Sequence, residues 1–396
     1  MLRLTNTVQP YAWGSTTAIP RLLGREPDGR PQAEMWIGAH PGAPSLADGE
    51  RLDERIAQAP AEFLGADGGD RLGFLLKVLA AGAPLSLQAH PDSATAARRY
   101  AQEEAAGVPA DAPHRLYKDT SHKPELLYAL EPFAAMAGFR SPADAHALLA
   151  GLELPALPPD AREVFDGLLG VLVGPDASAA LKEATRLLLT APAEAVAPLV
   201  EAVATACAGL DDPSAECVVE LAGHYPGDAG VLVSVLLNQV RLAAGEVLYL
   251  PAGNVHAYLS GTGVELMASS DNVLRGGLTP KHVDVPELLD VLDFRELPPP
   301  LLPPLPSSDP DEQVFSPLPD FALTVVRLGT ERRWERPVPR AVLVLEGMVT
   351  LSSAAGSLEL GQGETAFVTA AEHPLTLSGS GRLAAASPGD PATPHR

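Results

Sequence analysis

A glutamine and a histidine two residues apart form the first pair of side chains in this chain that could do chemistry. The segment SLQAHPD carries Gln88 and His90, and residues two apart on a β-strand point to the same face. Glu125 in HKPELLYAL and His256 in PAGNVHAYLSG each lie in a strand-like segment beside a proline or glycine turn. Two imidazoles, one carboxylate and one amide suit Zn²⁺ and leave room for water or substrate. Spacing alone does not require a metal, because Gln-x-His is a common pair.

The sequence pattern around these residues predicts a mainly β chain with a helical insertion. Residues 1–140 and 226–297 alternate short apolar runs with Gly and Pro turns, which is typical of strands. We assign both to one discontinuous catalytic domain. Residues 141–225 are rich in Ala, Leu and Glu and carry helix-start residues at Ser141 and Asp176. We therefore expect a helical domain with a structural role and without catalytic side chains.

The last quarter of the chain predicts a second, smaller β domain. Residues 298–312 are rich in proline and predict a stiff, extended connector. Residues 313–396 return to strand-like runs separated by turns. We expect this domain to be a degenerate relative of the catalytic one.

An internal repeat supports that expectation. The segment 245–256, GEVLYLPAGNVH, aligns without gaps with the segment 363–374, GETAFVTAAEHP. The second copy has Pro374 where the first has His256. We interpret the two segments as copies of one barrel unit, of which only the first carries a metal ligand. Chance similarity between two segments that each join a Gly turn to a strand is the alternative.

Charge and cysteine content narrow the class of protein. The chain has 28 basic and 50 acidic residues and a net charge of −22, so it has no overall field that would hold nucleic acid or an anionic membrane. Cys207 and Cys217 lie in apolar helical segments and read as small buried hydrophobes rather than a disulfide framework. No segment has the pattern of a signal peptide or a transmembrane span. We therefore expect a cytoplasmic protein without nucleic-acid or membrane partners.

Five segments resemble the signature blocks of one enzyme family. In chain order, up to about Phe294, they are YAWGS, SLQAHPD, HKPELLYAL, GEVLYLPAGNVHAYLSGTG and ASSDNVLRGGLTPKHVD. Together they resemble type I mannose-6-phosphate isomerase, also called phosphomannose isomerase, a zinc-dependent cupin family. The resemblance implies two cupin-like, jelly-roll β-barrels with an inserted helical domain. It also implies one zinc ion per chain, held by Gln88, His90, Glu125 and His256.

The same resemblance implies the reaction. Members of this family interconvert mannose 6-phosphate and fructose 6-phosphate through a cis-enediol intermediate. The family's active-site arginine corresponds to Arg275, whose permanent charge suits stabilisation of the enediolate rather than proton removal. Lys123, Asp271 and His122 are the candidates for proton transfer, and we favour Lys123 with Asp271 for ring opening. Which group removes the C2 proton is left open.

Other residues are expected to hold the substrate. The family's phosphate contacts correspond to Ser86, Lys281 and Lys77, and the two lysines would converge with Arg275 on one positive rim of an acidic protein. Glu265 is expected to bind a sugar hydroxyl. One aromatic residue near the N-terminus has two interpretations. Trp13 would stack on the sugar or close the pocket, although burial alone explains it equally well.

Two alternative functions remain open from the sequence. The chain could isomerise another phosphorylated sugar with a metal, or it could be a bicupin that binds sugar phosphates without turnover. A lysine and an arginine beside a metal, Lys123 and Arg275, favour an enzyme, because a binding protein would need neither. We expect a phosphorylated hexose as the small-molecule partner, and we favour a monomer.

Overall fold

An antiparallel sheet built around one long strand carries the candidate residues. The structure is a computed structural model that describes residues 1–391. The long strand, β12 (His256–Ala268), pairs with four other strands of this catalytic sheet. The strands of the catalytic sheet are β2 (Thr7–Gln9), β3 (Glu34–Ile37), β6 (Phe74–Ala81), β7 (Gln88–Ala89), β8 (Glu125–Ala129), β9 (Phe133–Phe139), β10 (Leu237–Leu242), β11 (Val247–Leu250), β12 and β13 (Leu274–Arg275).

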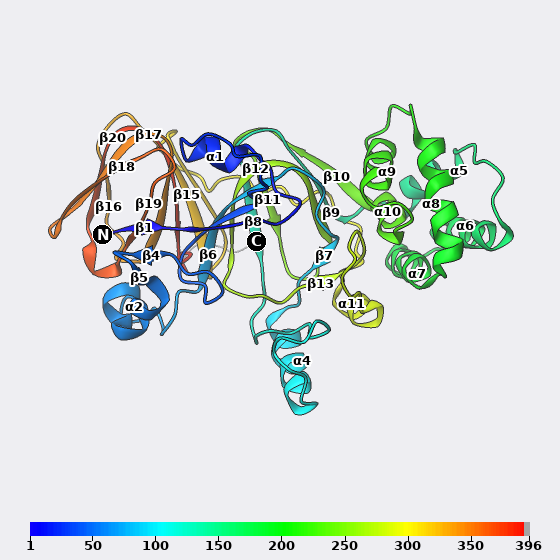
Figure 1. The fold of residues 1–396 in the computed structure, drawn as a ribbon, viewed down its shortest axis with the longest axis horizontal. Helices are drawn as coiled ribbons and strands as arrows, with labels where there is room; N and C mark the ends of the chain where they lie inside the picture. Colours follow the sequence, from blue (N-terminus) through cyan, green and yellow to red (C-terminus); the bar gives the residue numbers. More distant parts are fainter. Residues whose placement is uncertain (392–396) are drawn as a thin grey trace.

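A second antiparallel sheet, here called the C-terminal sheet, lies at one end of the molecule (Figure 1). Its longest strands, β17 and β20, pair with each other and enclose an apolar core. The strands of this sheet are β1 (Leu2–Thr5), β4 (Leu46–Ala47), β5 (Glu50–Arg51), β14 (Glu312–Leu318), β15 (Phe321–Leu328), β16 (Arg332–Trp334), β17 (Arg340–Ser353), β18 (Gly356–Gly361), β19 (Thr365–Val368) and β20 (Leu375–Ser387). With both sheets in place, the chain is mainly β.

The N-terminal strand departs from the domain boundary that the sequence suggested. Residues 1–140 were assigned to the catalytic part, but β1 pairs with β19, with Leu2 opposite Phe367, and β4 and β5 extend the same C-terminal sheet. The amino group of Met1 also pairs with Glu372. Alternating polarity identifies a strand but does not say which strand it will pair with. By pairing, these three strands belong with the C-terminal region.

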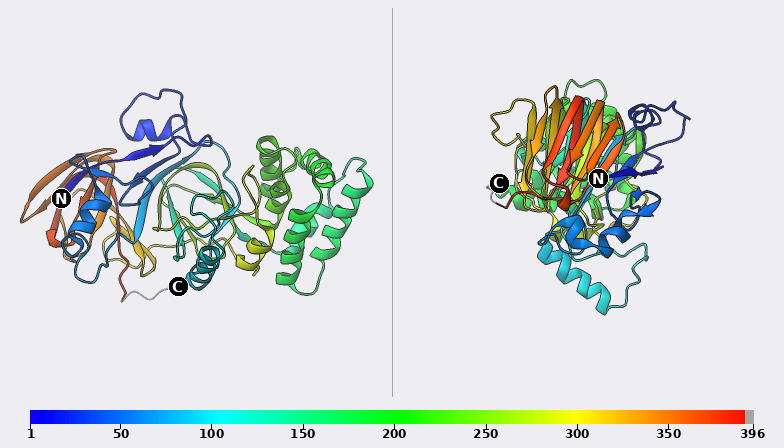
Figure 2. Two further views of the ribbon diagram at one scale, coloured as in Figure 1. Left: turned by 60° about the horizontal axis from the view of Figure 1, so that its bottom comes forward. Right: turned by 90° about the vertical axis from the view of Figure 1, so that its left-hand side faces the viewer.

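Helices form the opposite end of the molecule (Figures 1 and 2). The helix starts predicted at Ser141 and Asp176 are confirmed, because each side chain accepts a hydrogen bond from a backbone N–H of the first turn. The helices of this end are α5 (Pro142–Ala150), α6 (Pro159–Leu172), α7 (Ala177–Thr190), α8 (Ala193–Cys207), α9 (Pro213–His224) and α10 (Ala229–Val233). The remaining helices are α1 (Ala18–Leu22), α2 (Leu52–Gln58), α3 (Pro60–Leu64), α4 (Ser93–Ala105), α11 (Val285–Val291) and the short 3₁₀ turns η1 (Ser234–Leu236) and η2 (Ala370–Glu372).

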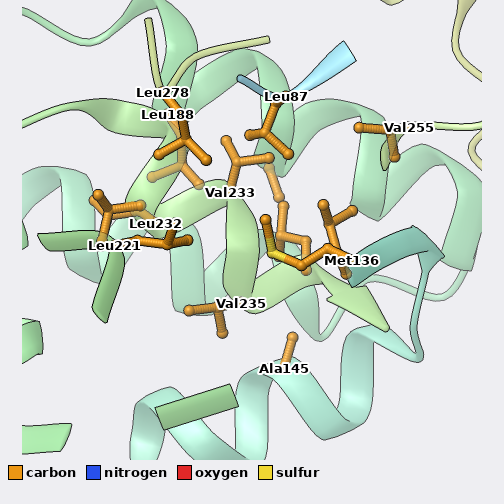
Figure 3. Close-up of a cluster of buried hydrophobic side chains, with 14 of the residues drawn as sticks. Leu87, Met136, Ala145, Leu188, Leu221, Leu232, Val233, Val235, Val255 and Leu278 are labelled. Atoms are coloured by element: carbon orange, nitrogen blue, oxygen red, sulfur yellow. The ribbon is translucent and has the colours of Figure 1, made fainter. Parts of the chain in front are cut away.

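The core of the helical end continues under the strands that carry the site. Figure 3 shows Leu87 and Val255 among the side chains of this core, together with residues of α7, α9 and α10. Leu87 and Val255 directly precede Gln88 and His256. Because side chains alternate along a strand, the helical core anchors one face of these strands and leaves the other face for the candidate ligands.

Within residues 1–391, no single helix is long and apolar enough to cross a membrane, and α7 and α8 satisfy that test only as a pair bent by 112°.

Candidate metal centre and substrate pocket

Strand pairing brings the predicted ligands to one place. Gln88 lies opposite His256 on one side and opposite Arg275 on the other. Glu125, the first residue of β8, lies opposite Met267 of β12. Segments far apart in the sequence therefore meet through the hydrogen-bond register of the catalytic sheet, and not through any local motif.

Three of the four predicted ligands form a tight, buried cluster. Glu125 Oε1 lies 3.5 Å from His90 Nε2, and Glu125 Oε2 lies 3.5 Å from His256 Nε2. The candidate ligand atoms of the three residues all lie within 4.8 Å of one another. No other group of three His, Cys, Asp or Glu side chains in residues 1–391 is arranged this way. The fourth, Gln88, lines the same cavity as Glu125 and His256.

Backbone carbonyl groups orient both imidazoles. His90 Nδ1 lies 2.7 Å from the carbonyl oxygen of Asn272, and His256 Nδ1 lies 3.1 Å from that of Asn254. A carbonyl oxygen can only accept, so each Nδ1 carries the proton and each Nε2 faces Glu125. This second hydrogen bond is the usual way in which a protein fixes the tautomer of a metal-binding histidine.

The charge states of the cluster suit a divalent cation. Burial and the nearby Lys123 ammonium lower the pKa of His90 to about 4, so its ring is neutral at pH 7. Burial alone would raise the pKa of Glu125, but the charge of Lys123 and the contact with His90 outweigh it and hold the pKa well below its ordinary value. The buried His90 Nε2 has no hydrogen-bond partner. A neutral nitrogen donor without a partner beside a carboxylate fits Zn²⁺.

A second charged group lines the wall of the same cavity, whose volume is about 50 Å³. The Lys77 ammonium lies 3.1 Å from Glu265 Oε2 and 3.5 Å from Glu34 Oε1. Burial alone would lower the pKa of Lys77, but these two carboxylates raise it. Burial and the charge of Glu265 raise the pKa of the neighbouring Tyr258 well above its ordinary value. This part of the wall therefore presents the Lys77 ammonium, two carboxylates and a phenol to a polar ligand, beside Lys123 and Glu125.

The predicted convergence of three cations is only partly found. The charge of Arg275 lowers the pKa of Lys281, so these two cations do share one region. Neither side chain makes an ion pair among the described residues. Lys77 instead lies opposite Glu265 on the neighbouring strand and is held by carboxylates. The role of Lys77 in phosphate binding therefore stays a prediction, and the two acids that this buried lysine contacts could not be known from the sequence.

The three candidates for proton transfer have different surroundings. Lys123 Nζ lies 2.9 Å from Glu125 Oε1, and both residues line the cavity. The exposed Asp271 lies 3.4 Å from His40 Nε2, a contact that lowers its pKa. His122 Nε2 lies 2.8 Å from Asp320, in the turn between β14 and β15. His122 is thus linked to the C-terminal sheet and does not line the cavity.

The two remaining predicted contacts lie near this pocket. Ser86 is half-buried and stands two residues before Gln88. Trp13 is half-buried and packs on a hydrophobic cluster that includes Leu85 and Tyr258, two residues of the cavity wall.

Sequence reasoning missed several polar residues of the site. Trp36 donates to Glu34 Oε2 at 2.7 Å, and its ring lies 5.0 Å from Lys77 Nζ. Glu34 and Trp36 stand two apart in AEMWIG, and Tyr258 stands two residues after His256. The period-2 spacing that identified Gln88-x-His90 could have found both pairs. Nothing in the sequence indicates that Asn272 offers its carbonyl oxygen to His90.

Comparison with known families gives a consistent result. The family model for the catalytic domain of type I phosphomannose isomerase matches residues 1–142, and the model for the cupin domain of mannose-6-phosphate isomerase matches residues 311–388. The mannose-6-phosphate isomerase of Escherichia coli (strain K12) is 38% identical, with coverage of 97% of this chain and 98% of that protein. The Bos taurus mannose-6-phosphate isomerase is 32% identical, with 93% of each chain covered.

Solved structures give the same result in three dimensions. The chain is similar to a mannose 6-phosphate isomerase from Salmonella typhimurium bound to fructose 6-phosphate and zinc, with a TM-score of 0.89 and 37% identity over 98% of this chain and 100% of that one. It is also similar to a zinc-bound mannose 6-phosphate isomerase, with a TM-score of 0.88 and 37% identity over 98% of this chain and 99% of that one.

Proposed function

Since the chain belongs to the type I phosphomannose isomerase family, we propose that the buried cluster of His90, Glu125 and His256 is its zinc centre and that the cavity beside it is where the reaction takes place. The chain is a zinc-dependent isomerase that interconverts mannose 6-phosphate and fructose 6-phosphate. One observation carries this assignment: an oriented pair of imidazoles and an ionised carboxylate meet in the wall of a polar cavity.

The first task of the site is to hold the cation and the sugar together. Gln88 would add an amide oxygen to the three other donors, since it lines the same cavity. Zinc held there supplies a Lewis acid that polarises the oxygen atoms on C1 and C2 of the sugar. The carboxylates of Glu34 and Glu265 can accept hydrogen bonds from sugar hydroxyl groups, and both lie beside the Lys77 ammonium.

The substrate carries negative charge at two places, on the phosphate and on the enediolate oxygen atoms. Two cations that make no ion pair among the described residues would each bind one of these charges. Arg275 lies opposite Gln88 and would stabilise the charge that develops on the enediolate oxygen atoms. Lys281 is exposed and would bind the phosphate, with the Ser86 hydroxyl as a neutral donor. A cis-enediol intermediate explains why a permanent cation must stand near the reacting carbon atoms.

Proton transfer needs a group that touches both the cavity and the sugar ring. Lys123 would take this role, because it lines the cavity in which the sugar would bind and contacts Glu125 there. Asp271, whose carboxylate is kept ionised by His40, would assist ring opening at the exposed side. His122 is bound to Asp320 and would have to exchange that contact to take part.

The C-terminal sheet has a structural role in this proposal. A cupin-domain match at residues 311–388 and the repeated Gly-Glu turn support an origin of both β regions from one barrel unit, so that the chain would be a bicupin. We infer that the protein is a monomer and that it is cytoplasmic. Its ligand would be a phosphorylated hexose, and it would bind neither nucleic acid nor membranes.

A coupled assay tests the proposal directly. Purified protein should convert mannose 6-phosphate to fructose 6-phosphate, lose that activity with a chelator and regain it when zinc is added. Turnover of another phosphorylated sugar alone would favour a different isomerase. Binding of mannose 6-phosphate without turnover, at full zinc occupancy, would favour a sugar-phosphate-binding protein.

A further inference from the structure

The C-terminal sheet contains a cavity that the isomerase reaction does not use. Its volume is about 380 Å³, which is within the usual range of small-molecule sites, about 300–1,000 Å³. Residues of the proline-rich connector, of β14 and β15, and of the segment that leads into β17 line it. The cavity is far in sequence from every residue of the metal centre.

A buried arginine without a polar partner is the main feature of this cavity. Arg340 is 7% exposed, yet it makes no ion pair or hydrogen bond among the described residues, and its Nε is unsatisfied. Its guanidinium lies 4.3 Å from the ring of Trp334. Burial and the like charge of Arg336 lower the pKa of Arg340 to about 10. A desolvated cation beside a second cation is costly unless an anion completes the arrangement.

Arg115, the other buried arginine among residues 1–391, shows a complete set of partners. Arg115 is 5% exposed, but its guanidinium donates to the carbonyl oxygen atoms of Tyr117 at 2.9 Å and Val108 at 2.6 Å, and it pairs with Glu104. The Arg340 side chain has the face of an aromatic ring and the attraction of the Glu312 carboxylate, but no hydrogen bond among the described residues. The difference indicates that Arg340 is arranged for a group from outside the described fold.

Other polar groups of the cavity wall also favour a ligand site. The Ser316 hydroxyl is buried, 6% exposed, and has no hydrogen-bond partner. Arg336 donates to the carbonyl oxygen atoms of Pro388 at 3.1 Å and Gly389 at 2.7 Å, which fixes its guanidinium at the cavity wall. The acids at this cavity are Glu312, which accepts from Trp334 Nε1 at 3.3 Å, and Asp390.

We propose that this cavity is a second ligand site, which binds the phosphate group of a small phosphorylated metabolite through Arg340, Arg336 and Ser316. Guanidinium and hydroxyl groups are the donors that match the oxygen atoms of a phosphate. The two acids balance the two cations, so the site would bind a single phosphate group and not a polyanion. The proposal does not depend on the identity of the substrate at the metal centre.

Titration with inorganic phosphate, followed by calorimetry, tests this site. The measurement uses the Lys281→Ala chain as background, so that the region beside Arg275 contributes little heat. Adding Arg340→Met, which keeps an apolar stem against Trp334, should weaken phosphate binding about tenfold or more. The matched control, Arg327→Met on the exposed face of β15, should bind phosphate as the background chain does. Equal affinity in the Arg340→Met and Arg327→Met chains would overturn the proposal.

Two further arms keep the test decisive. If Arg340→Met prevents folding, Ser316→Ala replaces it and should weaken phosphate binding severalfold, while unchanged affinity would count against the site. A chain shortened to residue 391 tests whether the remaining residues affect phosphate binding. Equal phosphate affinity in the full and shortened chains supports a site for a free ligand. Binding that appears only in the shortened chain would overturn it.

Discussion

The catalytic sheet and the C-terminal sheet contain the same local unit with different chemistry. In each, a glycine with positive φ precedes a glutamate, at Gly245 and at Gly363. The carboxylates of Glu246 and Glu364 each accept a hydrogen bond from the backbone N–H three residues earlier. A short strand and then a strand of 13 residues follow in both sheets, β12 in one and β20 in the other.

The difference lies in what the long strand meets at its start. β12 begins with His256, opposite Gln88. β20 follows Pro374, and its first residue, Leu375, lies opposite Trp334 in an apolar core. The turn and the long strand are therefore a frame that can be kept while the chemistry is changed at a few positions. Activity in this chain should depend on those positions and hardly at all on the repeated frame.

Removal of one histidine should have the largest effect. We expect His256→Ala to lose bound zinc and to lower kcat/KM about 1,000-fold or more, since metal catalysis contributes several kcal/mol. Metal analysis and the isomerase assay measure the two losses. His373→Ala is the matched control, because His373 stands beside the equivalent position in the C-terminal copy. If His256→Ala still binds about one zinc ion per chain, His256 is not a metal ligand, and the proposed difference between the two sheets is wrong.

Removal of the substrate's phosphate should come next. In the proposal, the exposed Lys281 and the half-buried Ser86 hydroxyl hold the phosphate. Charge-assisted hydrogen bonds contribute about 1.5–3 kcal/mol each, so the loss of two should reduce kcat/KM by two or more orders of magnitude, although such effects do not add cleanly. Steady-state rates on mannose and mannose 6-phosphate decide the matter. Free mannose within about tenfold of the phosphorylated sugar would contradict the assignment.

The two cations should then separate by role. Arg275→Ala should lower kcat about 100-fold or more with a smaller change in KM, because the charge it meets develops in the transition state. Lys281→Ala should raise KM about tenfold at nearly constant kcat, because it meets a charge that is already present in the ground state. Kinetics of both variants at equal zinc occupancy measure the split. The opposite pattern would exchange the two roles.

The sequence was sufficient for the residues of the metal centre but not for their surroundings. The donor atoms of His90, Glu125 and His256 suggested them as ligands, the family resemblance joined them, and the structure brings these three together. Gln88 as a fourth ligand stays a prediction. Helix starts at Ser141 and Asp176 were predictable because capping is a local interaction.

Properties that depend on contacts distant in sequence escaped prediction. The partner of β1, the two carboxylates around Lys77 and the carbonyl group that orients His90 are all set by strand register. A single residue of slip would change each of them, and a sequence pattern alone does not state which strand lies beside which.

A core substitution in the C-terminal sheet should have the smallest effect on activity. Leu351 of β17 is fully buried in the apolar core of that sheet, and Leu→Ala changes at such positions cost about 2–5 kcal/mol of unfolding free energy. We expect Leu351→Ala to lower Tm while zinc content and kcat stay within about twofold of the unchanged chain, because the core around Leu351 is built from buried residues of the C-terminal sheet alone, whereas the core that both sheets share consists of other residues. Met348→Ala on the same strand is the control, since Met348 is 51% exposed and its loss should change stability by about 0.5 kcal/mol or less. Thermal unfolding, metal analysis and the isomerase assay on the two variants separate stability from chemistry. If Leu351→Ala folds but releases zinc or loses kcat tenfold, the two sheets are coupled, and the contact between His122 and Asp320 is the first place to look for that coupling.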